Sequence, residues 1–519
     1  MSLARNVLVQ SSLTGASRIL GFLRDAVLAA RIGAGPVGDA WITALQFPNL
    51  FRRILAEGAF AQAFVPAYTR TKEDEGEATA AAVASETLSV LFTATIILSV
   101  AAQLAMPWIM LVLQNGYRDM PEIFELSILL TRITMPYLVG MALSALFSGV
   151  LNAAGKFALT AAAPTLLNIC LLAAVMFVEE PRAAAFAASV AVAVAGFLQA
   201  GVLLIGVRRQ GVDLRLALPR LTPPVKRVIA IAIPGALAAS ATQINIMISQ
   251  SLASWEVGAK TWLAMADRLY QLPLGLVGVA VGVAILPRLS KAAADTGETA
   301  DGARAMDEGV GLAMALTLPA AVALMVIPYF LVDVLFTRNA FLESDARMTA
   351  IALFHFGWGV PAFVLVKVLA PAFFARQDTV RPMRYAVASV ILNTVFGAAA
   401  FLWLRSQGEP GFPGLAVATS LAAWLNVLLL AGSLARRGIY RPSGAVAVRL
   451  VRIALATFAM AAVLWVGNER RDEIEALVFG SKELALALVI PAAGLVYLAA
   501  AFLFRAVTAS DLRAGLRRS

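Results

Sequence analysis

Long apolar stretches recur about every 25 to 50 residues along the chain, and each is long enough for the ~20 residues that a membrane-spanning helix needs. The composition agrees, because 60% of the 519 residues are hydrophobic and 14% are charged, against about 25% charged residues in an ordinary soluble protein. We therefore predict an all-α polytopic membrane protein with about fourteen transmembrane helices. Their centres are expected near Leu20, Phe51, Ile96, Leu138, Leu166, Val194, Leu237, Val277, Leu316, Leu365, Val390, Leu421, Ala456 and Val489.

The positive charges are unevenly distributed between alternate connections. Of the 42 Lys and Arg residues, we assign roughly 25 to cytoplasmic segments, roughly 10 to outside segments and roughly 7 to the membrane. This asymmetry follows the positive-inside rule and predicts that both termini are cytoplasmic. An anionic inner leaflet accounts for the net charge of +10, so no nucleic-acid partner is expected. The cytoplasmic segments include the connections 208–227, 288–304, 376–384 and 436–452 and the C-terminal stretch 505–518.

Signals for other kinds of site are weak. Arg18 and Arg24 interrupt the first apolar segment, which favours a retained first helix over a cleaved signal peptide. Cys170 is the only cysteine and excludes an intrachain disulfide. The sequence has neither a phosphate-cradling GxxxxGK loop nor an HExxH metal motif, so we expect no cofactor and no ATP hydrolysis.

The chain also repeats itself at an offset of 225 positions, which slips to 221 between Pro66 and Pro287. We interpret the repeat as two six-helix lobes, residues 1–215 and 216–440, which enclose a central site and work by alternating access. The last two spans, within residues 441–519, have no counterpart in this scheme. Chance similarity in an apolar chain is the alternative explanation. The pairs that share the offset are Pro48 and Pro273, Pro136 and Pro361, Gln46 and Gln271, and Asn168 and Asn393.

Seven ionisable residues lie within the first two apolar segments, and this cluster predicts a functional site because a charge at membrane depth costs several kcal/mol unless it faces a partner or a cavity. On an ideal helix, the polar residues of the second segment form one stripe about 80° wide. Asn49 lies beside this stripe, and Arg52 points elsewhere unless the kink expected at Pro48 rotates it. The seven residues are Arg18, Arg24, Asp25, Asp39, Arg52, Arg53 and Glu57, and the stripe contains Asp39, Thr43, Gln46, Arg53 and Glu57.

Arginine exceeds the nearby acids in this cluster, and Arg268 and Lys367 add further positive charge in the second half. Ion pairs that lock helices together could explain Arg24 with Asp25 and Arg53 with Glu57, but they leave a surplus of cations. An anion is the expected ligand, and arginine suits phosphate because its planar fork donates two parallel hydrogen bonds.

Four segments carry a resemblance that extends along essentially the whole chain. They read SRILGFLRDAVLAARIGAG, DAWITALQFPNLFRRILAEGAFAQAFVPAY, ADRLYQLPLGLVGVAVGVAILPRLS and VKVLAPAFFARQDTVRPM. In combination they resemble the signature segments of the MurJ (MviN) family, the bacterial lipid II flippases of the multidrug/oligosaccharidyl-lipid/polysaccharide exporter superfamily. The resemblance implies fourteen helices, two six-helix lobes around a cationic cavity, and two extra helices that form a hydrophobic groove.

The resemblance also implies roles for individual residues. Arg18, Arg24 and Arg52 would line the cationic cavity, with Arg268 contributed by the other lobe. Their acidic neighbours would be Asp25 and Asp39, and the same motif contains Asn49, Arg53 and Glu57. Enterobacterial members of the family carry a lysine at the position of Gln46 and a glutamate at that of Gln271, so the part of these two positions in charge coupling is open.

We accordingly expect a lipid flippase of the bacterial cytoplasmic membrane, driven by the membrane potential or an ion gradient, and not an enzyme. Its expected partners are lipid II, an undecaprenyl-pyrophosphate-linked disaccharide-pentapeptide, the membrane lipids and, as candidates, cell-wall synthases.

A flippase for another polyprenyl-linked saccharide would share the fold and the anion site. A cation or drug antiporter of the same superfamily should have an acid-dominated cavity. A membrane glycosyltransferase would need an acidic pair on a large outer loop, whereas the longest outside segment, about 468–483, is a short charged connection.

Overall fold

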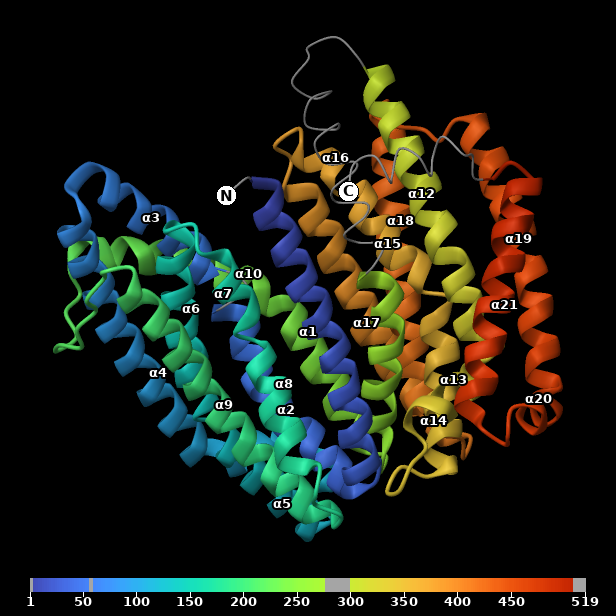
Figure 1. Cartoon of the computed structure of the whole chain (residues 1–519), viewed down its shortest axis with the longest axis horizontal. Coiled ribbons are helices and arrows are strands. Elements are labelled where there is room, and N and C mark those ends of the chain that lie inside the picture. Colours follow the sequence, from blue (N-terminus) through green and yellow to red (C-terminus); the bar gives the residue numbers. More distant parts are fainter. Residues whose placement is uncertain (1–2, 56–58, 276–298, 507–519) are drawn as a thin grey trace. The chain divides into compact units, whose positions relative to one another are not determined.

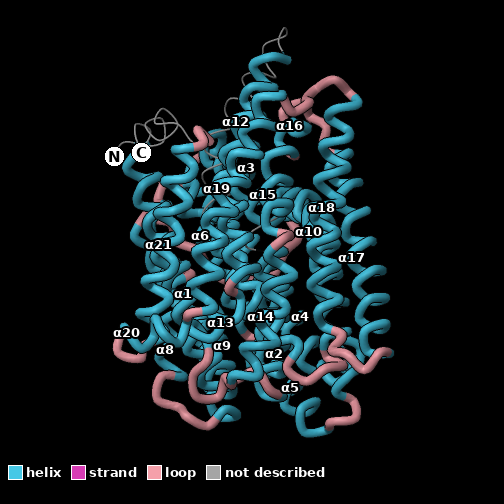
Figure 2. Tube along the Cα trace, turned by 90° about the vertical axis from the view of Figure 1, so that its right-hand side faces the viewer, coloured by secondary structure: helices cyan, strands magenta, loops and turns pink. Residues whose placement is uncertain are grey.

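A computed structural model of the chain describes residues 3–55, 59–275 and 299–506. Within these residues every regular element is a helix and no strand occurs, as Figure 2 shows. The prediction of an all-α protein is therefore confirmed. The structure divides into two compact units, which we describe separately: unit 1 comprises Met1–Thr261 and Arg338–Leu342, and unit 2 comprises Trp262–Thr337 and Glu343–Ser519.

Unit 1 is built from ten α-helices and one short 3-10 helix in the described residues. Helix α6 packs against α9 and α4, while α1 packs against α8 and α7 (Figure 1). An extended connection, residues 210–222, leads from α9 to α10. The helices are α1 (Leu3–Ile32), α2 (Pro36–Leu55), α3 (Ala59–Glu75), α4 (Glu77–Leu113), η1 (Asn115–Tyr117), α5 (Pro121–Thr134), α6 (Tyr137–Ala153), α7 (Phe157–Ala162), α8 (Thr165–Val175), α9 (Pro181–Arg209) and α10 (Pro223–Ala253).

Local sequence accounts for several helix boundaries in unit 1. The Glu180 carboxylate accepts hydrogen bonds from the backbone N–H groups of Ala183 and Arg182, which caps α9 and lowers the pKa of Glu180. Pro181 follows at the first helical position, where its missing N–H is not needed. Gly33 ends α1 with φ of +78°, and a Cβ atom there would lie 2.5 Å from the carbonyl oxygen of Ala340, so only glycine fits.

A helical segment, residues 259–275, leads from unit 1 into unit 2. Its residues up to Thr261 belong to unit 1, and those from Trp262 onward belong to unit 2. Helix α17 packs closely against α18, and α12 packs against α15 and α19. The remaining helices are α12 (Thr299–Val326), α13 (Pro328–Phe336), α14 (Glu343–Gly357), α15 (Val360–Leu369), α16 (Pro371–Phe374), α17 (Val380–Ser406), α18 (Phe412–Arg436), α19 (Gly444–Glu469), α20 (Arg471–Leu477) and α21 (Lys482–Leu503).

Ten helical segments of the described chain are long and apolar enough to cross a membrane. The expected spans near Leu20, Phe51 and Leu237 are helical in α1, α2 and α10 but are not among these ten, and Val277 lies outside the described residues. The total of fourteen spans therefore stays a prediction.

The repeat of 225 positions is visible in the order of the helices. Pro136 lies at the break between α5 and α6, and Pro361 lies at the start of α15, directly after the break that ends α14. In the same way, α4 corresponds to α12 with α13, and α9 corresponds to α18. The packing is less symmetric: α1 packs on α7, α8 and α9, whereas its counterpart α10 packs on α2, α3 and α4. The lobe limits at 215 and 440 are not tested by this comparison and stay a prediction.

The last two long helices, α19 and α21, lie side by side and pack on α12 and α13 (Figure 1). Buried residues of all four helices form one apolar core, which includes Phe330 and Leu464. At one end of α13, the carboxylate of Asp333 pairs with Arg471 and with Lys482, whose Nζ lies 3.1 Å from Asp333 Oδ1. These two ion pairs fasten the connection between α19 and α21 to the rest of unit 2.

Candidate functional site

Arg24 is the best-defined cationic residue of the predicted site. It lies on α1 with 8% of its surface exposed. Its Nε and Nη2 atoms donate to Asp25 Oδ1 at 2.9 and 2.6 Å, and Nη1 donates to Asn168 Oδ1 at 2.7 Å. The structure therefore brings Arg24 and Asp25 together, as the sequence pattern indicated.

The Arg24–Asp25 ion pair joins neighbouring residues of one helix, so it does not lock two helices together. Three of the five N–H groups of the guanidinium are used by Asp25 and Asn168. One N–H on each terminal nitrogen has no partner among the residues that the structure describes. Two N–H groups on adjacent nitrogens are suited to an oxyanion such as phosphate.

Asn168 is a residue of this site that the sequence analysis did not place among the predicted site residues. It comes from α8, has 6% of its surface exposed, and donates through Nδ2 to the carbonyl oxygen of Ser17 at 3.1 Å. A Cβ atom on Gly21 would lie 3.6 Å from the amide nitrogen, so the small residue gives the amide room. Asn168 thus holds Arg24 and connects α8 to α1. Its presence in the 225-residue repeat was the one signal that marked it in the sequence.

Asp39, at the start of α2, is completely buried and forms a different constellation. Its Oδ1 accepts hydrogen bonds from the backbone N–H of Thr261 at 2.9 Å and from the Thr261 hydroxyl at 2.7 Å. Its Oδ2 accepts from the backbone N–H of Gly258 at 2.7 Å and from the hydroxyl of Tyr117. Four donors account for the acceptor sites of a carboxylate, so Asp39 fastens α2 to η1 and to the first turn of residues 259–275. A role of Asp39 in substrate binding stays a prediction.

A second charged residue, Lys260, is buried with Asp39 and was also missed in the sequence. Its Nζ donates to the hydroxyl of Thr43 at 3.1 Å, and its charge interacts with that of Asp39. Gln114 donates to the same hydroxyl. The stripe on α2 therefore contributes Asp39 and Thr43 to a buried polar cluster within unit 1, and a lysine at the start of an apolar segment gave no indication of this contact.

The other predicted site residues are less completely described. Arg18 is exposed on α1, and Asn49 is half-buried on α2. The backbones of Arg52 and Arg53 lie in α2, but their side chains and the whole of Glu57 lie outside the described residues. Arg268 is half-buried in unit 2. Nearby in unit 2, the Gln271 amide donates to the Asp267 carboxylate, while Gln46 is half-buried on α2 of unit 1.

The side chains around Arg24 are of types that hydrogen-bond and carry charge. In the described parts of the chain, no three His, Cys, Asp or Glu side chains come together in a way that could hold a metal ion. Arginine, asparagine and backbone groups bind by charge and hydrogen bonding and need no covalent step. The arrangement around Arg24 therefore supports recognition of an anionic group.

Comparison with known proteins places the chain in a family. A model of the family described as lipid II flippase MurJ matches residues 28–487. Two curated relatives named probable lipid II flippase MurJ, from Rhizobium tropici and Rhizobium meliloti (strain 1021), are 38% and 36% identical, and each alignment covers 100% of this chain and 97% of the relative. A solved structure described as lipid II flippase MurJ in an inward closed conformation aligns with a TM-score of 0.78 and 21% identity over 96% of this chain and 99% of that one.

The solved structure, at its low sequence identity, supports the fold alone, whereas the family model and the curated relatives extend over nearly the whole chain. With its apolar helices, the chain is a multi-pass membrane protein. It belongs to the MurJ family of lipid II flippases, which are transporters and not enzymes.

Proposed function

We propose that the chain moves lipid II from the inner to the outer leaflet of the bacterial cytoplasmic membrane by alternating access through a cationic central cavity. The polar head of this lipid cannot cross hydrocarbon unaided, because its pyrophosphate and saccharide would lose their hydration without compensation. A protein that performs the transfer must offer the head polar and charged partners at membrane depth. Membership of the MurJ family and the arginine-rich first two helices support this proposal.

The observation that carries the proposal is the setting of Arg24. Asp25 and Asn168 hold the guanidinium in one orientation and leave one N–H group on each terminal nitrogen. Because the side chain is held before a ligand arrives, binding a phosphate loses less side-chain entropy. Arg18, Arg52 and Arg268 would add positive charge around the pyrophosphate, and the same sequence motif contains Asp39, Asn49, Arg53 and Glu57.

The energetics favour outward movement of an anion. In a cell with a negative interior, the membrane potential supplies about 2.3 kcal/mol per charge per 100 mV to that movement. The return of the empty cationic cavity would offset part of this gain. We therefore propose that transport is driven by the membrane potential or by an ion gradient, with no cofactor, and that both termini are cytoplasmic.

The lipid tail needs a separate apolar path. We propose that the tail lies against α19 and α21, whose outer faces expose large apolar side chains such as Phe458 and Leu495. Cell-wall synthases, which consume the flipped lipid, are candidate partners of the chain.

The deciding experiment is depletion of the protein in a walled bacterium that depends on it, followed by measurement of lipid II in each leaflet. A membrane-impermeant amine reagent labels the peptide of lipid II in the outer leaflet, and permeabilised cells give the total. We expect labelled lipid II to fall while the total rises, and expression of the wild-type chain to reverse both. Unchanged sidedness contradicts the proposal, and accumulation of another polyprenyl-linked saccharide instead would identify a different substrate.

A further inference from the structure

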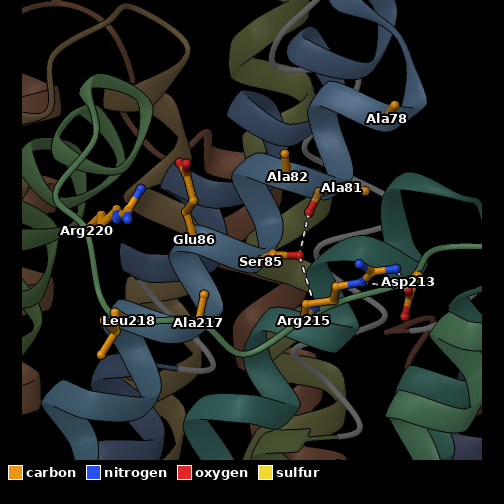
Figure 3. Close-up of a pocket in the computed structure, with 10 residues that line it drawn as sticks. All are labelled: Ala78, Ala81, Ala82, Ser85, Glu86, Asp213, Arg215, Ala217, Leu218 and Arg220. Carbon is orange, nitrogen blue, oxygen red and sulfur yellow. Dashed lines mark hydrogen bonds and ion pairs between the residues drawn. The ribbon is translucent and has the colours of Figure 1, made fainter.

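The connection between α9 and α10, residues 210–222, is held along the side of α4 in an extended conformation. We name these residues the strap. Leu214 is buried in the core formed by α3, α4, α6 and α9, so the middle of the strap is anchored. Figure 3 shows the strap beside α4. Three hydrogen bonds join the two: Arg215 N to Ser85 Oγ at 3.2 Å, Ala217 N to Ser89 Oγ at 3.0 Å, and Thr222 Oγ1 to Glu86 Oε2 at 2.7 Å.

The position of the strap along α4 places it at the membrane boundary. Helix α4 has 37 residues and is therefore about 56 Å long, while the hydrocarbon core of a bilayer is about 30 Å thick. Glu86 is the last charged residue of α4, and residues 87–113 contain none. The hydrocarbon is crossed within this uncharged part, which is about 40 Å long, so Ser85 and Glu86 lie outside the hydrocarbon and the strap that binds them lies in the interfacial layer.

Three leucines of the strap point into the surroundings and not into the protein. Leu216, Leu218 and Leu221 are 59%, 81% and 58% exposed, although they belong to a non-helical connection. Apolar side chains that are exposed at the boundary can enter the outer edge of the acyl layer.

Positive charge accompanies these leucines. Residues 208–227 contain six basic residues and one acidic residue, Asp213. A pocket of about 540 Å³ lies between the strap and α4, and its polar lining includes Ser85, Glu86, Arg215 and Arg220. Asp213 is paired with Arg215 at 2.9 Å, and Glu86 accepts the hydrogen bond from the strap. Arg220 has no ion-pair partner among the described residues, so its charge is available to a ligand.

We propose that the strap is a binding site for an acidic phospholipid, in which Arg220 and its basic neighbours contact the phosphate while Leu216, Leu218 and Leu221 enter the acyl layer. Charge complementarity selects the acidic lipid, because the strap has a net positive charge at a membrane surface. Apolar insertion combined with basic residues gives stable attachment where either signal alone is weak. The site is independent of the proposed transport substrate, because none of its residues belongs to the Arg24 site.

The test uses the full-length chain in lipid nanodiscs. Cys170, the only cysteine, is replaced by alanine, and Leu218→Cys is labelled with an apolar, environment-sensitive fluorophore. Quenching by lipids that carry a nitroxide in the headgroup region is measured with zwitterionic lipid alone and with 30% phosphatidylglycerol. We expect the acidic lipid to increase quenching by about two-fold, and high salt to reduce the increase.

The same measurement on variants locates the effect. Arg215→Gln combined with Arg220→Gln should abolish the increase, because the phosphate loses its nearest cations. Arg118→Gln is the control, since Arg118 is exposed in the connection at the other end of α4. The proposal is overturned if the label stays in water in both lipids, if quenching is equal with and without acidic lipid, or if Arg118→Gln has the same effect as the double variant.

Discussion

At the scale of single residues, Arg24 is a cation whose immediate partners are known. Asp25 and Asn168 use three of its N–H groups and hold it in place. Replacing Arg24 by alanine removes two unused N–H donors, and hydrogen bonds to charged groups contribute about 1.5–3 kcal/mol each. We expect Arg24→Ala to lower lipid II transport by about 100-fold or more, measured as outer-leaflet lipid II in depleted cells.

Two further variants separate loss of a ligand from loss of stability. Arg24→Ala removes the cation that donates to Asp25 Oδ1, whereas Arg24→Ala with Asp25→Asn also removes the carboxylate charge. The double variant should insert normally and still fail to transport. Arg118→Ala, at an exposed arginine outside the site, should leave transport unchanged. Normal cell-wall growth with Arg24→Ala at native expression would show that Arg24 is not a substrate ligand.

Arg18 allows a test of geometry against charge. It is exposed on α1, six residues before Arg24. Arg18→Lys keeps the charge but loses the planar fork that donates two parallel hydrogen bonds. We expect a loss of transport of about 10-fold, as for one charged hydrogen bond. Full activity of Arg18→Lys would indicate that positive potential alone is required there.

Asn168 should act by positioning Arg24. Asn168→Leu removes the acceptor for Arg24 and the donor to Ser17 but keeps the number and branching of the side-chain heavy atoms, so the guanidinium loses one of its two fixed partners. We expect transport to fall by about 10-fold while the half-saturating lipid II concentration of purified protein rises, because the arginine is less well ordered. The matched control is Gly21→Ala, whose added methyl group would make only an ordinary 3.6 Å contact with Asn168. Equal losses in both variants would indicate a packing effect.

At the scale of helices, α2 carries a buried polar cluster near its start and predicted cationic site residues near its end. Its first two turns carry Asp39 and Thr43 in the buried cluster with Lys260, while Arg52 and Arg53 belong to its last turn. Asp39 accepts three hydrogen bonds, one from Gly258 and two from Thr261, and so joins α2 to the start of residues 259–275. One helix therefore carries both predicted cationic residues and the attachment of the segment that enters unit 2.

This attachment predicts a specific stability effect. Asp39→Ala leaves Lys260 buried without its counter-charge, which should lower the free energy of unfolding by about 3–5 kcal/mol. Asp39→Ala with Lys260→Met removes both charges and should recover the part of the loss that comes from the unpaired charge, while the donors of Gly258 and Thr261 still lack their acceptor. Thermal unfolding in detergent measures the difference, and the single variant Lys260→Met provides the reciprocal comparison. If Asp39→Ala and the double variant unfold at the same temperature, the two charges do not depend on each other.

At the scale of the whole molecule, the last two long helices stand apart from the repeat. Helices α19 and α21 pack on α12 and α13, and their connection is fastened by Asp333. The proposed separation of head and tail assigns the head to the arginine cluster and the tail to these helices. Mutations can therefore change the contacts to the head and the contacts to the tail separately.

Bulky substitutions of small residues in these helices provide the test. A Cβ atom on Gly494 would meet nothing within 4 Å, so Gly494→Trp should fold and fill space beside α21. We expect it to weaken transport of the long-chain lipid by about 10-fold while leaving binding of a soluble headgroup analogue unchanged, because tail contacts are apolar and depend on packing. Ala461→Trp, on half-buried Ala461 of α19, is the companion variant. Equal losses for lipid and analogue would assign these helices a structural role.

Sequence patterns alone were sufficient for the all-α membrane fold, because hydropathy and charge are properties of contiguous segments. The apolar stretches around Ile96, Leu316 and Leu421 became α4, α12 and α18, and two prolines of the repeat, Pro136 and Pro361, lie at helix breaks. The resemblance also named the correct family. The sequence could not show that α10 packs on α3 and α4 while its counterpart α1 packs on α8. The packing partners of a helix depend on which helix faces meet.

Some features of the candidate site follow from the sequence, and others depend on the tertiary structure. Sequence by itself determined that Arg24 and Asp25 lie in an apolar segment and that an anion is the expected ligand. Only the tertiary structure decided that Asn168 holds Arg24 and that the backbone of Gly258 binds Asp39, contacts between residues 144 and 219 positions apart. Such contacts depend on the rotation and crossing of helices about their axes, which are set by the packing of many side chains at once and leave no local pattern in the chain.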